Sequence, residues 1–262
     1  MSNRKGKINV VGIGPGSPDH ITPAAKKAIQ DADIIVGYKT YLDLIQDLIK
    51  EKKVMSSGMR QEVDRCAKAV ELAQDGKTVA VICSGDPGIY AMAGLVFEIV
   101  FGQQKVVGAR RAVPLPQVDI EIIPGIPALS ACASRLGAPL MHDFASISLS
   151  DLLTPWELIE KRLEAAASAD FVIVIYNPKS KGRQDHIKKA RDIILKHRSP
   201  ETPVGIVTGA SRENETVAVT DLQNMLDNEI DMQSTVIIGN TNTFTWQGRM
   251  VTPRGYSTKY KI

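Results

Sequence analysis

The chain has 262 residues, of which 44% are hydrophobic and 23% charged, and its formal net charge at pH 7 is +3. This length suits one large domain or two of ordinary size, and the composition is that of a globular protein with a hydrophobic core. The small net charge favours neither nucleic acid nor a membrane as a partner, and no apolar run approaches the roughly 20 residues of a membrane span.

The first predicted strand, Ile8–Val11, leads into a glycine-rich loop, GIGPGSPD, at Gly12–Asp19. A dinucleotide-binding loop would need its third glycine where Ser17 stands, followed at once by a helix. Pro15 also removes an amide donor from the loop, and no P-loop lysine follows the last glycine. The sequence therefore disfavours a nucleotide-phosphate loop, and a tight turn that requires glycine dihedrals remains open.

Short apolar runs alternate with segments of helical period along the whole chain, which predicts α/β layers. The predicted strands are Ile8–Val11, Ile34–Val36, Thr78–Ile82, Ile120–Ile123, Ser146–Leu149, Phe171–Tyr176, Val204–Val207, Thr216–Val219 and Thr235–Ile238. Between them, Gln61–Gln74 places Val63, Cys66, Ala67, Val70 and Ala73 on one helical face.

Capping signals predict three helix starts. Thr22-Pro23 and Asp86-Pro87 each combine a capping side chain with proline at the first helical position. The sequence from Thr154 to Glu157 has the spacing of a capping box.

The segment Gln103–Asp119 is basic, contains prolines and lacks periodicity, so we predict a surface insertion before the strand at Ile120. We divide the chain into two α/β domains, residues 1–123 and 124–262. Near the C-terminus, a hairpin with its turn at Gln247-Gly248 is predicted.

Cys66, Cys83 and Cys132 are far apart and lack metal-binding spacing. We expect them to be reduced core residues of a cytoplasmic protein, and we expect no metal site. The N-terminus passes from polar residues into a short apolar run, which is not the pattern of a signal peptide.

Glycine-rich or polar loops follow five of the predicted strands. They are Gly12–Asp19, Ser84–Tyr90, Pro124–Ala131, Tyr176–Arg183 and Thr208–Glu215. Ligands of open α/β sheets bind outside the carboxyl ends of the strands. Five such loops from two halves of the chain predict a ligand cleft between two α/β domains. Their glycines and prolines favour contacts through backbone groups, which suits a ligand such as an adenosine.

Several motifs together resemble the tetrapyrrole methylase family. They are VVGIGPGSPDHIT, GDPGIY and PGIPALSACASRLGAPLMHDF. Further segments, LMHDF through SDLLTPWE, SGMRQEVDRC and MVTPRGY, are similar to its precorrin-3B C-17-methyltransferase (cobalt-factor III methyltransferase) branch. The resemblance implies methylation of C-17 with ring contraction in cobalamin biosynthesis, with S-adenosylmethionine as methyl donor, S-adenosylhomocysteine as product and a homodimeric enzyme.

The resemblance also implies site residues. For the cofactor they are Pro15, Gly85, Asp86, Gly88, Ile89, Pro127, Ala128, Asn177, Ala210 and Ser211. From the residues alone, Asp86 is as well explained by helix capping, and both roles can coexist.

Because the implied substrate carries acetate and propionate arms, cations beside the motifs are candidate substrate ligands. These are Lys39, Arg60, Arg183 and Arg212, although each alone is as well explained as a solvated surface charge. His142 is a candidate for moving protons during ring contraction, with a structural role as the alternative.

Three other functions stay open at this point. They are a methylase of the same fold acting on another corrin position or on a protein or RNA, a nicotinamide-dependent dehydrogenase, and a non-catalytic binding module. The failed dinucleotide pattern argues against the dehydrogenase. Whether the substrate carries cobalt is left undecided by the sequence.

Overall fold

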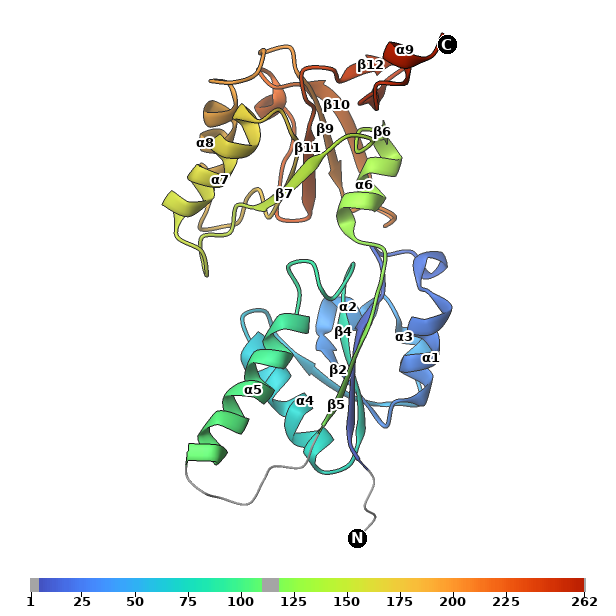
Figure 1. Ribbon diagram of the computed structural model, residues 1–262. Helices are drawn as coiled ribbons and strands as arrows, with labels where there is room; N and C mark the ends of the chain where they lie inside the picture. Colours follow the sequence, from blue (N-terminus) through green and yellow to red (C-terminus); the bar gives the residue numbers. More distant parts are fainter. Residues whose placement is uncertain (1–4, 110–117, 262) are drawn as a thin grey trace. The chain divides into compact units, whose positions relative to one another are not determined.

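The computed structural model describes residues 5–109 and 118–261, and it divides into two compact units, Met1–Pro127 and Ala128–Ile262. The predicted boundary after residue 123 coincides with the end of the last strand of the first unit. Both units are α/β, with the elements labelled in Figure 1.

The first unit contains a five-stranded parallel sheet in the order β3-β2-β4-β1-β5. Its strands are β1 (Lys7–Gly12), β2 (Ile34–Tyr38), β3 (Lys53–Ser57), β4 (Thr78–Cys83) and β5 (Asp119–Ile123). Its helices are η1 (Pro18–His20), α1 (Pro23–Asp31), α2 (Lys39–Asp43), α3 (Gln46–Ile49), α4 (Glu62–Gln74) and α5 (Ala93–Ala109). The alternation of side chains along each strand sends apolar residues to both faces of this sheet, and each face is covered by helices. Figure 1 shows α4 and α5 on one side and α1 and α3 on the other.

The second unit contains a mixed sheet in the order β10-β9-β11-β8-β7, in which β7 and β8 are parallel and the other neighbours antiparallel. Its strands are β7 (Phe144–Ser148), β8 (Val172–Tyr176), β9 (Pro203–Thr208), β10 (Thr216–Asp221) and β11 (Ser234–Ile238). A small sheet joins β6 (Gly137–Ala138) to β12 (Phe244–Trp246) and β13 (Arg249–Val251). The helices are α6 (Ala128–Leu136), α7 (Trp156–Ser168), α8 (His186–Ile194), η2 (Met225–Asp227) and α9 (Tyr256–Lys259).

The main core of the second unit lies between its sheet and helices α7 and α8. Helix α6 also packs on the sheet, where Gly205 of β9 leaves room for Leu136. A Cβ at Gly205 would lie 2.3 Å from Leu136 Cδ1. The predicted hairpin is confirmed, since β12 and β13 pair around a turn with positive φ at Gln247 and Gly248.

Two predicted helix starts are confirmed in position, at Thr22 and near Thr154, and the one at Asp86-Pro87 is wrong. Thr22 caps α1, its side chain accepting from Ala25 N at 3.1 Å. No helix follows Asp86-Pro87, because α5 begins only at Ala93. Helix α7 begins at Trp156 with no side-chain cap, so the predicted capping box does not form.

The predicted insertion Gln103–Asp119 is also partly wrong. Helix α5 continues through Ala109, and β5 begins at Asp119. The rest of that segment, residues 110–117, lies outside the described residues.

The cysteines are buried and free, as predicted. Burial raises the pKa of the Cys66 and Cys132 thiols to about 11 and that of Cys83 to about 12. In the described part of the chain, no helix is both long and apolar enough to cross a membrane.

Candidate active site

Three loops of the first unit meet backbone to backbone at the carboxyl ends of β1, β4 and β5. Gly14 and Gly85 form a two-way bridge, with Gly85 N donating to Gly14 O at 2.8 Å and Gly14 N to Gly85 O at 3.2 Å. A Cβ on Gly125 would lie 2.2 Å from Gly85 O, and one on Gly12 would lie 2.6 Å from the same oxygen. The glycines of the first loop therefore serve close approach of main chains, and Pro15 follows this bridge.

Asp86 connects two of these loops through its carboxylate. Its Oδ1 accepts from Gly88 N at 2.8 Å and its Oδ2 from Gly125 N at 3.2 Å. Asp86 therefore caps the amides of two loops, whereas the sequence predicted that it caps a helix. A carboxylate offers about four acceptor sites, so these bonds leave capacity for a ligand. Beside it, the backbone of Gly88 is exposed and Ile89 is half-buried.

Arg65 on α4 is a buried cation near the same edge of the sheet, and the sequence interpretation missed it. Its Nε donates to Ser57 Oγ at 2.7 Å and its Nη2 to Gly58 O at 2.9 Å, while Nη1 approaches Met92 Sδ at 3.3 Å. No carboxylate among the described residues forms an ion pair with it. No signal in the sequence pointed to this residue, because the helical face predicted within Gln61–Gln74 does not include it, whereas the face that is buried does.

The predicted substrate cations of the first unit are exposed. Lys39 forms an ion pair with Asp43 at 3.0 Å on the same short helix. Arg60 lies after β3 with a positive φ of 65°, and its backbone N donates to Glu62 Oε1 at 3.2 Å. Both follow the carboxyl ends of strands, β2 and β3 respectively.

In the second unit, Asn177 and Arg183 belong to one hydrogen-bonded cluster at the ends of β7 and β8. Asn177 adopts a φ of 51°, and its Nδ2 donates to Ser148 Oγ at 2.9 Å. Arg183 Nη1 donates to Leu149 O at 2.8 Å and to Asn177 O at 3.1 Å. Its Nε lies 3.6 Å from the Asp151 carboxylate. Arg183 therefore holds the loop that presents Asn177.

Asp151 also meets His186 Nε2 at 3.0 Å, and the His186 ring packs edge-on against Trp156 at 4.6 Å between centroids. Partial desolvation raises the pKa of Asp151, but the hydrogen bond from His186 and the nearby charges outweigh it and hold that pKa below its usual value. Asp151 and His186 were not predicted, because their pairing spans 35 positions of sequence.

The loop after β9 carries Ala210, Ser211 and Arg212. Ser211 has a φ of 63°, and its backbone N donates to Glu215 Oε2. Arg135 of α6 joins that carboxylate at 2.9 Å. Positive φ at non-glycine residues costs energy and is concentrated at functional sites. Among the described residues with this conformation, Arg60, Asn177 and Ser211 are predicted site residues.

The remaining predicted residues are placed as follows. Ala210 is buried, and Arg212 Nη1 donates to Gln233 Oε1 at 3.2 Å. Pro127 ends the first unit, and Ala128 begins α6.

The structure does not bring His142 together with the other candidates of its unit. It precedes β7, whereas Ser148 and Asn177 lie at the other end of the β7–β8 pair. Its Nδ1 accepts from the Asp143 backbone N at 2.9 Å. A direct role in proton movement stays a prediction.

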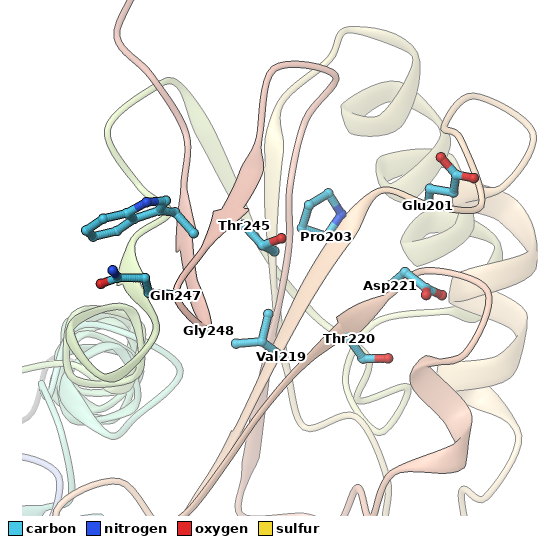
Figure 2. A pocket seen from close by; sticks show the side chains of 9 residues that line it. Glu201, Pro203, Val219, Thr220, Asp221, Thr245, Gln247 and Gly248 are labelled. Carbon is cyan, nitrogen blue, oxygen red and sulfur yellow. The ribbon is translucent and has the colours of Figure 1, made fainter.

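A separate cavity of about 430 Å³ lies between the start of β9, the end of β10 and the β12–β13 hairpin (Figure 2). Glu201, Asp221 and Trp246 are among its lining residues. The loop with Ser211 follows the opposite end of β9, so this cavity is distinct from the candidate site.

Comparison with known proteins identifies the family of the chain. Residues 7–226 match the family model for tetrapyrrole (corrin/porphyrin) methylases. This chain belongs to the tetrapyrrole methylase family. The predicted tetrapyrrole methylase fold is thereby confirmed.

Within the family, this methylase is similar to two cobalt-factor III methyltransferases and to one solved structure. It is 54% identical over 260 residues to the cobalt-factor III methyltransferase of Priestia megaterium, covering 98% of this chain and 46% of that protein. It is 50% identical over 250 residues to a probable cobalt-factor III C(17)-methyltransferase of Salmonella typhimurium, covering 95% and 99%. The crystal structure of the methyltransferase CobJ matches with a TM-score of 0.86 and 35% identity, covering 95% of this methylase and all of that chain.

Proposed function

We propose that this methylase is an S-adenosylmethionine-dependent C-methyltransferase that methylates C-17 of cobalt-factor III, or of metal-free precorrin-3B, with ring contraction in cobalamin biosynthesis. The observation that carries the proposal is the 50% identity to the Salmonella typhimurium relative, which extends over nearly the whole of both chains. The methylase spans about half of the Priestia megaterium relative, so whatever the rest of that protein does is not proposed here.

The polar groups of the first-unit loops suit the binding of S-adenosylmethionine. The Asp86 carboxylate retains acceptor capacity for a cationic group, and the exposed Gly88 backbone permits close approach. We assign Asp86, Gly88 and Ile89 to the cofactor, with Pro15 and Gly85 beside them. Pro127, Ala128, Asn177, Ala210 and Ser211 complete the assignment. When bound, S-adenosylmethionine supplies a methyl group already activated on a positively charged sulfonium.

The residues of the chain act mainly by holding the reactants in place. An electron-rich macrocycle provides its own carbon nucleophile, so the protein needs no activated serine or cysteine. Methyl transfer requires the carbon, methyl group and sulfur in line, and rigid loops supply that geometry. The Gly14–Gly85 bridge and the Arg183 hydrogen bonds make these loops rigid. The negative charge of Asp86 favours a cationic ligand next to it.

The carboxylate arms of the substrate are assigned to cations at the strand ends. We propose Lys39, Arg60 and Arg212 for direct contacts. Arg183 was also predicted as a direct ligand, but its Nη1 is committed to two carbonyls, so we assign it to holding the Asn177 loop.

The deciding experiment is anaerobic incubation of the purified methylase with S-adenosylmethionine and cobalt-factor III, and in parallel with precorrin-3B. We expect a product that carries one added methyl group and a contracted ring, identified by mass spectrometry and NMR. A chain that binds S-adenosylhomocysteine but methylates neither tetrapyrrole would contradict the proposed substrate.

We also propose a homodimer, as the family resemblance implies. Light scattering coupled to size-exclusion chromatography tests it, and a monomer at micromolar concentration would refute it.

A further inference from the structure

The loop between β7 and α7 presents two leucines to solvent at the same strand ends as Asn177. Leu153 is 93% exposed and Leu152 is 75% exposed, more than any other large apolar residue in the described part of the chain. Exposed apolar side chains are common singly, but an adjacent pair on an ordered loop suggests an apolar partner.

This loop is anchored on both sides of the leucines. On one side, Leu149 N donates to Tyr176 O at 2.9 Å, and Asp151 pairs with His186 and Arg183. On the other side, the Trp156 ring packs against His186. These contacts on both sides hold the two leucines at the surface.

The neighbouring β8–α8 loop adds positive charge to this apolar pair. It is tied to the leucine loop by Arg183 and His186, and it carries Lys179 and Lys181. Within the described chain neither lysine forms an ion pair. Among residues 177–185 of the sequence, Asp185 is the single acidic residue. Apolar surface beside unpaired cations fits a ligand with an apolar plane and carboxylate arms.

We propose that Leu152 and Leu153 form an apolar contact for one face of the tetrapyrrole ring, and that Lys179 and Lys181 bind its carboxylate arms. This inference rests on the proposed function and names residues that determine specificity for its substrate. A second protein chain is a poorer fit, because a stable interface buries roughly 800 Å² per partner. Two leucines flanked by Asp151 and Glu157 offer far less apolar surface than that.

The test compares L152Q/L153Q with the matched control L158Q, which changes a leucine that is 41% exposed on α7. The dissociation constant of cobalt-factor III is measured anaerobically by absorbance titration, and that of S-adenosylhomocysteine by calorimetry. For L152Q/L153Q we expect the cobalt-factor III dissociation constant to rise about tenfold or more. Its S-adenosylhomocysteine affinity and melting temperature stay at wild-type values, and L158Q behaves as wild type.

The lysines are tested by K179Q/K181Q against K161Q, an exposed lysine on α7. We expect weaker cobalt-factor III binding and a smaller dependence on salt for the first variant alone.

Unchanged cobalt-factor III binding by L152Q/L153Q, in a chain whose wild type methylates that substrate, overturns the inference and leaves the proposed function standing. A wild type that neither binds nor methylates cobalt-factor III or precorrin-3B overturns the proposed function itself. Loss of dimers, or of binding to anionic phospholipid vesicles, in L152Q/L153Q with tetrapyrrole binding intact would assign the leucines to another partner and also overturn the inference.

Discussion

Single side chains at the strand ends hold the backbone around them in place. Asp86 is the clearest case, because each of its oxygens accepts from the amide of a different loop segment. The same carboxylate therefore fixes the loop and provides charge, which reconciles its two possible sequence interpretations.

Replacing Asp86 with Asn tests that dual role. The amide keeps one acceptor but presents a donor to a backbone N–H and removes the negative charge. Charge-assisted hydrogen bonds contribute about 1.5–3 kcal/mol, so we expect S-adenosylhomocysteine affinity to fall at least tenfold by calorimetry. D75N, at an exposed carboxylate after α4, is the matched control. Wild-type affinity in D86N would contradict the assignment.

Arg65 leads to a prediction about stability. Its removal leaves Gly58 O and Ser57 Oγ, both in partly buried hydrogen bonds, without their charged donor, and it empties the buried space of the Arg65 side chain. We expect R65A to lower the free energy of unfolding by about 2–4 kcal/mol in urea titrations, since hydrogen bonds from a charged donor are lost and a buried side chain is truncated to leave a cavity. R162A, at an exposed position of α7, should change it by less than about 1 kcal/mol. Equal values for the two variants would show that the Arg65 contacts add nothing.

At the scale of elements, the strands and the amphipathic helices follow from local pattern, and the loops do not. Buried apolar runs such as β4 and β8 were predicted within a residue or two, because full burial leaves a continuous apolar signature. Strand β3 was missed because it is an edge strand whose residues are largely exposed.

The prediction of loop geometry was wrong for a different physical reason. Asp86-Pro87 carries the local signal of a helix start, but its carboxylate is satisfied by Gly125, 39 positions away. The meeting of Gly12, Gly85 and Gly125 likewise depends on three strands being neighbours in the sheet. Sequence could name these residues through family resemblance, but it could not supply their contacts.

The glycine junction itself predicts a contrast between two substitutions. G125A would place a Cβ 2.2 Å from Gly85 O, whereas a Cβ on Gly94 of α5 meets nothing within 4 Å. We expect G125A to destabilise the fold by more than about 2 kcal/mol, and G94A to stabilise it by up to about 1 kcal/mol through its higher helix propensity. Denaturant unfolding measures both. A neutral G125A would mean that the three loops can separate at little cost.

For the whole molecule, the net charge of +3 provides little general attraction to anions, so cations at the site must supply it. The proposed substrate carries several carboxylates, whereas S-adenosylhomocysteine is a zwitterion without net charge. We therefore expect cobalt-factor III affinity to fall severalfold as KCl rises from low to high concentration, while S-adenosylhomocysteine affinity hardly changes. Titrations of both ligands across a salt series measure this. Salt-independent binding of the tetrapyrrole would count against the proposed lysine and arginine contacts.

The three buried thiols have a practical consequence for assays of the proposed reaction. Reaction with oxidants and alkylating agents proceeds through the thiolate, and pKa values of about 11 to 12 leave almost none of it at neutral pH. The polypeptide should therefore withstand purification in air without added reductant. Activity lost on exposure to oxygen should then be traced to the tetrapyrrole and restored by fresh substrate.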